Sequence, residues 1–288
     1  MIAGGTERPV AILAGGGKLP PLVAAAALRE GRTPVVFAIA GEAEPKAFAP
    51  APMHLVRWGE IGRMFRLMQE AECREAVFVG SISHRPDFMA LKPDLGTVKL
   101  IPRIIQLMGR RDGTLLDGVT RIFEEKGIRV LSPLDIAPDL ALPEGCLTGE
   151  VSRESARDID VARDAAVEIG KLDIAQGAVA VDGRIVAVED ASGTDAMLKR
   201  LTELRRAGTI PRTGGVLVKC LKPQQDGRHD LPTIGPQTAE RSAQAGLAGV
   251  AAEAGRAILV GREETADAFR RFGLFLAGLA PMPQSGHG

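Results

Sequence analysis

The sequence of 288 residues contains no tyrosine, and its aromatic residues together make up only 3% of the chain. Proteins that bind single-stranded nucleic acid stack the bases on aromatic side chains, so this scarcity argues against such a platform. The chain also lacks an excess of either charge, with 36 basic and 36 acidic residues, whereas a general nucleic-acid binder carries a basic excess. We therefore expect no nucleic acid among its partners.

Cysteine and histidine are scarce as well. The three cysteines, Cys73, Cys146 and Cys220, are scattered and show neither a disulfide framework nor a zinc spacing. The four histidines form no His-Glu-x-x-His pair, and the Asp-x-His and Asn-His-Glu runs of calcineurin-like phosphoesterases are missing. This composition argues against a zinc or histidine-based manganese site, and the lack of a disulfide framework indicates a reducing compartment.

Long apolar runs are also missing. No stretch approaches the ~18 consecutive apolar residues of a membrane-spanning helix. The first residues do not combine a basic segment with a following apolar core, so they do not resemble a secretory signal. Together with the cysteine pattern, these absences predict a cytoplasmic protein.

The first half of the chain alternates regularly between apolar, strand-like runs and helical stretches. Such alternation predicts a parallel sheet covered by helices on both faces, and we expect a Rossmann-like N-terminal domain over residues 1–135. The predicted strands are Pro9–Leu13, Thr33–Ala40, His54–Arg57, Ala76–Val79 and Ile128–Leu131. The predicted helices are an alanine-rich one ending near Glu30, then Ile61–Glu70, Thr97–Met108 and Thr114–Lys126.

A triple glycine, Gly15–Gly17, follows the first predicted strand. Its spacing is not the dinucleotide-binding fingerprint, and the lysine after it is not followed by the serine or threonine of a phosphate-binding P-loop. Glycines between a strand and a helix still let backbone amides approach an anion, although a plain tight turn explains them equally well. Gly80 and Ser81 follow another predicted strand and would line the same crevice if the sheet order brings the two strands together.

Residues 136–150 contain two prolines, Pro138 and Pro143, soon after Pro133, and show no sustained periodicity, which is typical of a linker between domains. A mixed α/β domain is expected over residues 151–280. It begins with a helix at Glu154–Ile169 and contains at least one β-hairpin. The tail, residues 281–288, is expected to be disordered.

The hairpin covers Ala178–Val188, with an Asp-Gly turn at its centre. Glu189 and Asp190 follow its second strand directly, and two acids in that place belong either to a solvated loop or to a site. Ser192 and Asp195 stand at the start of the next predicted helix. They match a capping box, which explains both residues without any chemistry.

A second strand-like run, Val216–Leu221, is apolar on both faces and is therefore expected to be buried. Lys219 alternates with two leucines on one of these faces. A buried ammonium without a partner is costly, so Lys219 requires an anionic neighbour unless its amine reaches water at the end of the buried stem.

Charged residues then crowd into a short loop. Asp226, Arg228 and Asp230 follow the strand, and Pro236 is suited to the first position of a new helix. Asp226 and the glycine after it are also a common turn dipeptide. A lysine, carboxylates, an arginine and a helix start within one loop indicate a phosphate and metal site. Magnesium is the metal that uses one or two carboxylates together with phosphate oxygens and water.

These two stretches carry a family resemblance. The runs AVEDASGTDAM (187–197) and VKCLKPQQDGRHDLPTIGP (218–236) resemble the signatures of LpxI-type UDP-2,3-diacylglucosamine pyrophosphatases, which act in lipid A biosynthesis in Gram-negative bacteria. The resemblance extends over nearly the whole chain, because the triple glycine and the Val79–Ser81 element also occupy the family's positions. The second run is long and specific. Ser192 departs from the family's usual motif, which has glutamate there.

The resemblance implies magnesium-dependent hydrolysis of the diacylated UDP-sugar to UMP and the diacylated sugar 1-phosphate, lipid X. Asp226 would ligate Mg²⁺ or activate the water, and Asp230 or Glu189 would complete the metal site. Lys219 and Arg228 would neutralise charge on the phosphate oxygens. The expected substrate-binding residues are Gly15, Gly16, Gly17, Leu19, Gly80, Ser81, Gly193, Thr194, Asp195 and Thr213. The resemblance also suggests a homodimer.

Other interpretations remain open. The chain could be a nucleotide-sugar or dinucleotide-binding module that senses without cutting, with Gly15–Gly17 as its main site, or a synthetase that consumes ATP. The predicted helix within Thr97–Arg111 is apolar with basic flanks. It could hold acyl chains, make peripheral contact with the inner membrane, or simply cover the core.

Overall fold

A computed structural model shows the chain as two compact units that divide between Pro138 and Asp139. Each unit has its own sheet and its own apolar core. The structure describes residues 8–82, 93–108, 115–172, 174–190, 192–222, 227–228 and 231–281. The predicted metal ligands Asp226 and Asp230 and the tail beyond residue 281 lie outside these ranges.

The N-terminal unit is built on a five-stranded parallel sheet in the order β3-β2-β1-β4-β5. Its strands are β1 (Pro9–Ala14), β2 (Thr33–Ile39), β3 (Met53–Val56), β4 (Glu75–Val79) and β5 (Arg129–Leu131). The direction of winding reverses at β1, because β2 and β3 lie on one side of it and β4 and β5 on the other. This is the strand order of the Rossmann fold, so the predicted class of the N-terminal domain is confirmed.

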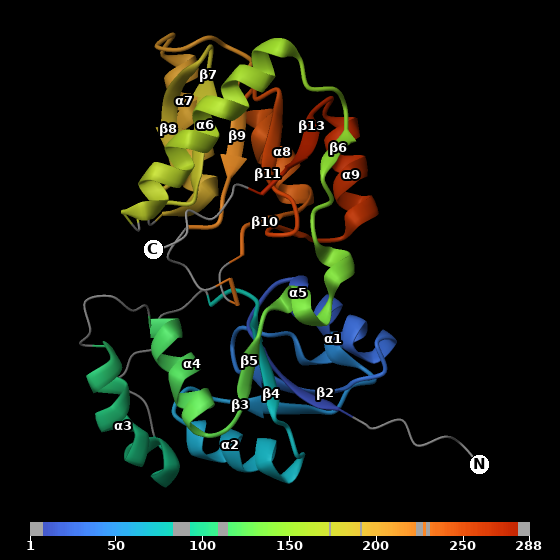
Figure 1. Ribbon diagram of the computed structural model, residues 1–288, viewed down its shortest axis with the longest axis vertical. Coiled ribbons are helices and arrows are strands. Elements are labelled where there is room, and N and C mark those ends of the chain that lie inside the picture. The colour runs from blue at the N-terminus through green and yellow to red at the C-terminus, as the bar shows by residue number, and fades with distance from the viewer. Residues whose placement is uncertain are drawn as a thin grey trace. The chain divides into compact units, whose positions relative to one another are not determined.

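Helices cover both faces of this sheet (Figure 1). On one face, Met64, Met68 and Phe123 pack with alternate sheet residues such as Phe37. On the other side, α1 contacts β1, β2 and α5. The helices are α1 (Leu19–Arg29), α2 (Ile61–Glu70), α3 (Leu95–Met108), α4 (Leu115–Glu125) and the short α5 (Pro133–Ile136), with a 3-10 turn at η1 (Pro45–Phe48).

The C-terminal unit contains a six-stranded mixed sheet in the order β6-β13-β11-β9-β7-β8. Its strands are β6 (Gly145–Thr148), β7 (Gly177–Val181), β8 (Arg184–Val188), β9 (Val216–Lys219), β11 (Gly249–Glu253) and β13 (Phe275–Leu279). The three central strands, β9, β11 and β13, are parallel, and antiparallel strands extend the sheet on both sides. A separate parallel pair is formed by β10 (Thr233–Ile234) and β12 (Ile258–Leu259). The predicted mixed α/β class is confirmed.

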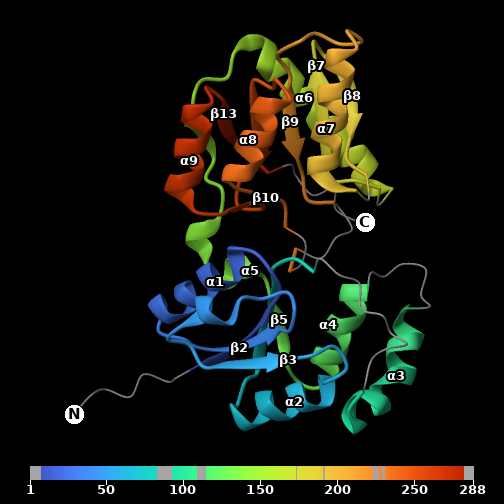
Figure 2. The same cartoon turned by 180° about the vertical axis from the view of Figure 1, so that it is seen from behind.

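This sheet is also covered on both faces, as Figure 2 shows from behind. One face carries α7 (Gly193–Arg206), α8 (Pro236–Gln244) and α9 (Arg262–Arg271), and the other carries α6 (Arg153–Lys171). The faces of β9 alternate as predicted: Leu217 packs with the α7 side, whereas Val216 and Val218 pack with α6. A short 3-10 turn, η2 (Pro138–Leu140), spans the division between the two units.

The predicted hairpin is present and consists of β7 and β8. Asp182 and Gly183 both have positive φ values, 52° and 73°. Two consecutive positive φ values define the type I′ turn that joins tightly paired antiparallel strands. The position of this turn sets the register of β8 and therefore places Glu189 at the end of the strand.

Candidate functional site

The strand directions bring Glu189 and Lys219 to the same edge of the C-terminal sheet. Both β8 and β9 pair antiparallel with β7, so they run in the same direction and end at the same edge. Glu189 directly follows β8, and Lys219 is the last residue of β9. The start of β7 lies between them: Gly177 is in register with Lys219, and its carbonyl accepts a hydrogen bond from the Glu189 amide at 2.9 Å.

Gly177 has a specific role in this arrangement. A Cβ atom at this position would lie 2.7 Å from Oε2 of Glu189, which is closer than such atoms approach in folded proteins. The missing side chain therefore provides the space in which the Glu189 carboxylate lies over β7. A glycine at the start of a strand, opposite an acid, is the feature of the sequence that marks this site.

Thr194, in the first turn of α7, connects the lysine with the glutamate. The Lys219 ammonium donates a hydrogen bond to the Thr194 hydroxyl at 2.8 Å, and this hydroxyl donates to Oε1 of Glu189 at 2.8 Å. Lys219 is only 6% exposed and Glu189 only 8%. The lysine amine thus does not reach bulk water, and the interpretation of Lys219 as a buried residue with an anionic neighbour holds. We call Lys219, Thr194 and Glu189 the buried triad.

Burial is the main influence on the charge of Lys219. It lowers the pKa of the ammonium below that of a free lysine, and the negative charges of Glu189 and then Asp195 oppose this shift. One carboxylate oxygen of Glu189, Oε2, is buried and has no hydrogen-bond partner among the described residues. The triad therefore joins an ammonium and a carboxylate through one hydroxyl, and the carboxylate opposes the lowering of the Lys219 pKa by burial.

The loop between β8 and α7 is held by Asp190. Its Oδ1 accepts hydrogen bonds from both the amide and the hydroxyl of Ser192, and its Oδ2 pairs with Arg200 at 3.0 Å. The hydrogen bonds from Ser192, and then the charge of Arg200, lower the pKa of Asp190. The alternative in which Ser192 and Asp195 form a capping box is wrong, because the Ser192 side chain makes no capping bond to α7 and bonds to Asp190 instead.

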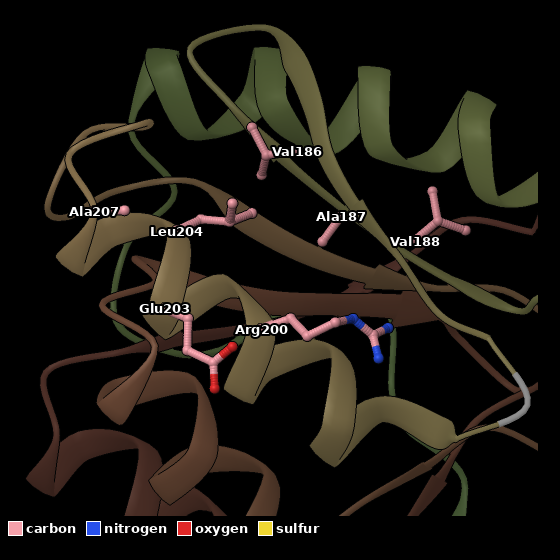
Figure 3. Close-up of a pocket in the computed structure, with 7 residues that line it drawn as sticks. All are labelled: Val186, Ala187, Val188, Arg200, Glu203, Leu204 and Ala207. Carbon is pink, nitrogen blue, oxygen red and sulfur yellow. The ribbon is translucent and has the colours of Figure 1, made fainter.

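A groove leads along α7 to this loop (Figure 3). Its volume is about 420 Å³, and it lies between β8 and α7. Leu204 and Ala207 lie at one end, while the Arg200 guanidinium extends toward the Val188 end, where the chain enters the site loop. The lining residues are Val186, Ala187, Val188, Arg200, Glu203, Leu204 and Ala207.

The starts of α7 and α8 lie side by side. The two helices contact one another, and the Gln237 side-chain amide lies 3.5 Å from Oδ2 of Asp195. Helix α8 begins at Pro236, as predicted, and the Thr238 hydroxyl accepts a hydrogen bond from the Gly235 amide. Two helix N-termini, both favourable places for an anion, thus belong to the same face of the sheet as Lys219.

Other predicted site residues are distributed less simply. Thr213 precedes β9 and lies at the opposite, N-terminal end of the strand from Lys219. Arg228 is half-buried and has an interaction partner. Among the residues that the structure describes, no three histidine, cysteine or acidic side chains gather closely enough to hold a metal ion. Because Asp226 and Asp230 fall outside that set, the predicted magnesium ligands stay a prediction.

The N-terminal unit brings the glycine motifs together at the switch of its sheet order. β1 and β4 are neighbours, and the loops after them are joined by hydrogen bonds from Gly15 to the Val79 carbonyl, from Gly16 to the Ser81 carbonyl and from Ser81 to the Gly16 carbonyl, at 2.8–3.0 Å. Such a switch point is where ligands of these sheets bind. The glycine motifs predicted to line one crevice therefore lie together, where two predicted strands end side by side.

The same bonds limit what the glycines can do. The amides of Gly15 and Gly16 are already donated to carbonyls, so they are not available to an anion. A Cβ at Gly15 would lie 2.5 Å from the Ser81 carbonyl oxygen, so close packing explains this glycine. Helix α1 begins at Leu19 and has Pro20 and Pro21 in its first turn, which removes two of its free N–H donors. The tight-turn interpretation thus accounts for the first two glycines.

Comparison with known proteins identifies the family. The model of the LpxI N-terminal domain matches residues 9–140, and that of the LpxI C-terminal domain matches residues 143–277. The chain belongs to the LpxI family. A curated LpxI protein of Caulobacter vibrioides, named UDP-2,3-diacylglucosamine pyrophosphatase LpxI, is 41% identical over 278 residues, which cover 95% of this chain and 98% of the relative.

Among solved structures, the enzyme WbmG of Bordetella bronchiseptica in complex with NAD matches 31% of this LpxI chain and 30% of its own chain, with 18% identity and a TM-score of 0.25. At these values the similarity supports no conclusion about function. The family assignment rests on the two domain matches and the Caulobacter relative.

Proposed function

We propose that this protein is a hydrolase that cleaves the pyrophosphate bond of UDP-2,3-diacylglucosamine, giving UMP and 2,3-diacylglucosamine 1-phosphate in lipid A biosynthesis. The observation that carries the proposal is the 41% identity, over nearly the full length of both chains, to a relative named for this activity. Matches to both LpxI domains support it, because both domains of the family are present together in this chain.

The charges at the edge of the C-terminal sheet suit a diphosphate substrate. Lys219 supplies a positive charge at the carboxyl ends of parallel strands, next to the N-terminus of α7. Positioned cations and backbone donors stabilise the negative charge that develops on phosphate oxygens during phosphoryl transfer. We assign Lys219 and Arg228 to this task and Asp226 to the activation of water or the ligation of metal.

Magnesium is the proposed cofactor. When bound, it would neutralise charge on the bridging diphosphate, and Asp226 and Asp230 are the carboxylates assigned to hold it. Glu189, the third predicted ligand, fits this role poorly. One of its oxygens accepts the Thr194 hydrogen bond, the other is buried, and its charge supports a neighbouring ammonium.

The acyl chains of the substrate require apolar surface. Helix α3 contacts α2 and α4, yet it leaves Val98, Ile101 and Ile105 exposed by 47%, 38% and 64%. We propose that this apolar strip serves the lipid part of the reaction, either by holding acyl chains or by touching the inner membrane. No helix in the described part of the chain is long and apolar enough to cross a bilayer. A homodimer and a cytoplasmic location complete the proposal.

The experiment that tests the proposed function incubates the protein with UDP-2,3-diacylglucosamine and MgCl₂ and follows UMP by chromatography. We expect UMP with magnesium and none after chelation by EDTA. A sensing module would instead bind the nucleotide sugar without releasing UMP, with or without the metal. The main site of such a module would be Gly15–Gly17. Two amides of this segment already donate hydrogen bonds within the fold, which argues against this alternative.

A further inference from the structure

We infer that Glu189 and Thr194 are positioning residues that hold Lys219 and the first turn of α7 for the reaction, and that Glu189 is not a magnesium ligand. The inference rests on the proposed function, because it assigns the two residues to the site of that reaction. It differs from the role expected from the sequence, in which Glu189 helped to bind the metal.

The first argument is the geometry of the Thr194 hydroxyl. A hydroxyl has one proton to donate and lone pairs to accept with. The Thr194 hydroxyl donates a hydrogen bond to Glu189 and accepts one from Lys219, each at 2.8 Å. Both hydrogen bonds of this hydroxyl thus lie within the triad. Because Thr194 is the second residue of α7, these two bonds fix the start of the helix against the edge of the sheet.

The second argument concerns the space around Glu189. Its Oε2 atom has no access to solvent and lies where a side chain on Gly177 would otherwise be. Magnesium retains several waters and requires near-octahedral geometry, so it requires room that this oxygen does not have. The charge of this carboxylate also opposes the lowering of the Lys219 pKa by burial.

The third argument is electrostatic. A divalent cation beside Glu189 would lie next to the Lys219 ammonium, and two positive charges in a buried region repel each other strongly. Burial lowers the pKa of Lys219 and the Glu189 carboxylate opposes this shift, while the Thr194 hydroxyl orients the ammonium. An ammonium has three donors, of which one goes to Thr194.

The test compares Glu189→Gln, Thr194→Val and Thr194→Ser in the UMP-release assay at several magnesium concentrations. We expect kcat to fall about 10- to 100-fold in Glu189→Gln and Thr194→Val, a range typical of residues that orient a functional side chain. The magnesium concentration for half-maximal rate should keep its wild-type value. Thr194→Ser, which retains the hydroxyl, should recover most of the loss.

Matched controls separate positioning from general damage. Thr202→Val makes the same change further along α7, where the hydroxyl donates to the Leu198 carbonyl, and Glu240→Gln neutralises an exposed acid on α8. Both should keep wild-type kcat. The double variant Glu189→Gln with Thr194→Val should fall no further than either single variant, because each change breaks the same unit.

Three results would overturn the inference. A rise of about tenfold or more in the magnesium requirement of Glu189→Gln would make Glu189 a metal ligand. Losses that multiply in the double variant would show that the residues act separately. Equal activity of Thr194→Val and wild type would remove Thr194 from the site.

A stability measurement distinguishes a failure of this inference from a failure of the proposed function. If the wild-type protein releases no UMP, the proposed function fails, yet the triad is still testable by thermal unfolding. Glu189→Gln should lower Tm, and adding Lys219→Met should restore part of the loss, because the uncompensated buried charge is removed. Tm losses that add in the double variant would refute the triad itself.

Discussion

Lys219 is the residue whose ionisation most directly links structure to activity. Burial lowers the pKa of its ammonium, while Glu189 and Asp195 raise it. As pH rises through this lowered pKa, the amine loses the charge that we propose stabilises the substrate phosphate. The alkaline decline in activity should therefore have its midpoint below about pH 10.4, the ordinary pKa of lysine.

Neutralising Glu189 should move this alkaline decline. Glu189→Gln removes the carboxylate with the larger of the two influences that oppose the effect of burial, so the pKa of Lys219 falls further and the decline moves to lower pH. The measurement is the pH dependence of kcat for the two proteins, with Glu240→Gln as control. An unchanged profile, or a shift to higher pH, would contradict the coupling of these residues.

The cysteines allow a second test at the residue scale. Cys73 and Cys220 are buried, and burial raises the pKa of their thiols to about 11 and about 12, whereas Cys146 is exposed. Only the thiolate reacts readily. Ellman's reagent should therefore modify one thiol per chain in the native protein and three in denaturant. Rapid modification of more than one native thiol would show that a core opens more easily than its packing indicates.

Among the elements, the junction of α2 and α3 depends on one acid. The Asp94 carboxylate accepts hydrogen bonds from the Gly62, Arg63 and Thr97 amides, and the Thr97 hydroxyl bonds to the Gly59 carbonyl. Asp94 therefore satisfies free N–H groups at the starts of two helices. Although burial opposes it, hydrogen bonding lowers the pKa of Asp94.

Asp94→Ala should cost about 1 kcal/mol of unfolding free energy, as expected for a lost helix cap. Since the folded pKa is lowered, the stabilisation is fully present above the unfolded value of about 3.9 and is lost as pH falls through the folded value. The difference in unfolding free energy between wild type and variant, measured with urea, should thus be constant from neutral pH down to about 5 and should narrow clearly below 4. A difference that vanishes near pH 6 would contradict this origin.

Element types were predictable where periodicity is strong. The helix Ile61–Glu70 and the hairpin with its Asp182-Gly183 turn were predicted within a residue or two, because an amphipathic period and a turn dipeptide are local signals. Strand β11 was missed: its sequence, Gly-Val-Ala-Ala-Glu, is short and rich in small residues, and only its position between β9 and β13 makes it a strand.

The candidate site was predictable in composition but not in arrangement. Lys219 was predicted as a site residue because a lysine on an apolar strand requires an anionic neighbour. Which anion it would find depends on β8 and β9 ending at one edge, and strand order is a property of the whole sheet that local sequence does not encode. The same limit applied to Gly15 and Gly80, which meet only because β1 and β4 are neighbours.

At the scale of the whole molecule, the apolar strip of α3 leads to a prediction about membranes. Val98, Ile101 and Ile105 are exposed on this helix, and Lys99 is exposed beside them. If the strip contacts lipid, the protein should sediment with anionic liposomes at low salt, and Ile101→Glu with Ile105→Glu should remain in the supernatant. Leu172→Glu, at another exposed apolar residue, is the control. Equal sedimentation of all three proteins would rule out a bilayer contact through α3.

The central claim is that an acid-bearing site in the C-terminal domain cleaves a diphosphate bridge. The most direct measurement is the rate of UMP release from UDP-2,3-diacylglucosamine with magnesium, for wild type, Asp226→Ala and the control Asp267→Ala, whose acid is exposed on α9. We predict UMP from the wild type and the control and none from Asp226→Ala, which should still bind the substrate. Near-normal release by Asp226→Ala, or binding without release by the wild type, would contradict the account.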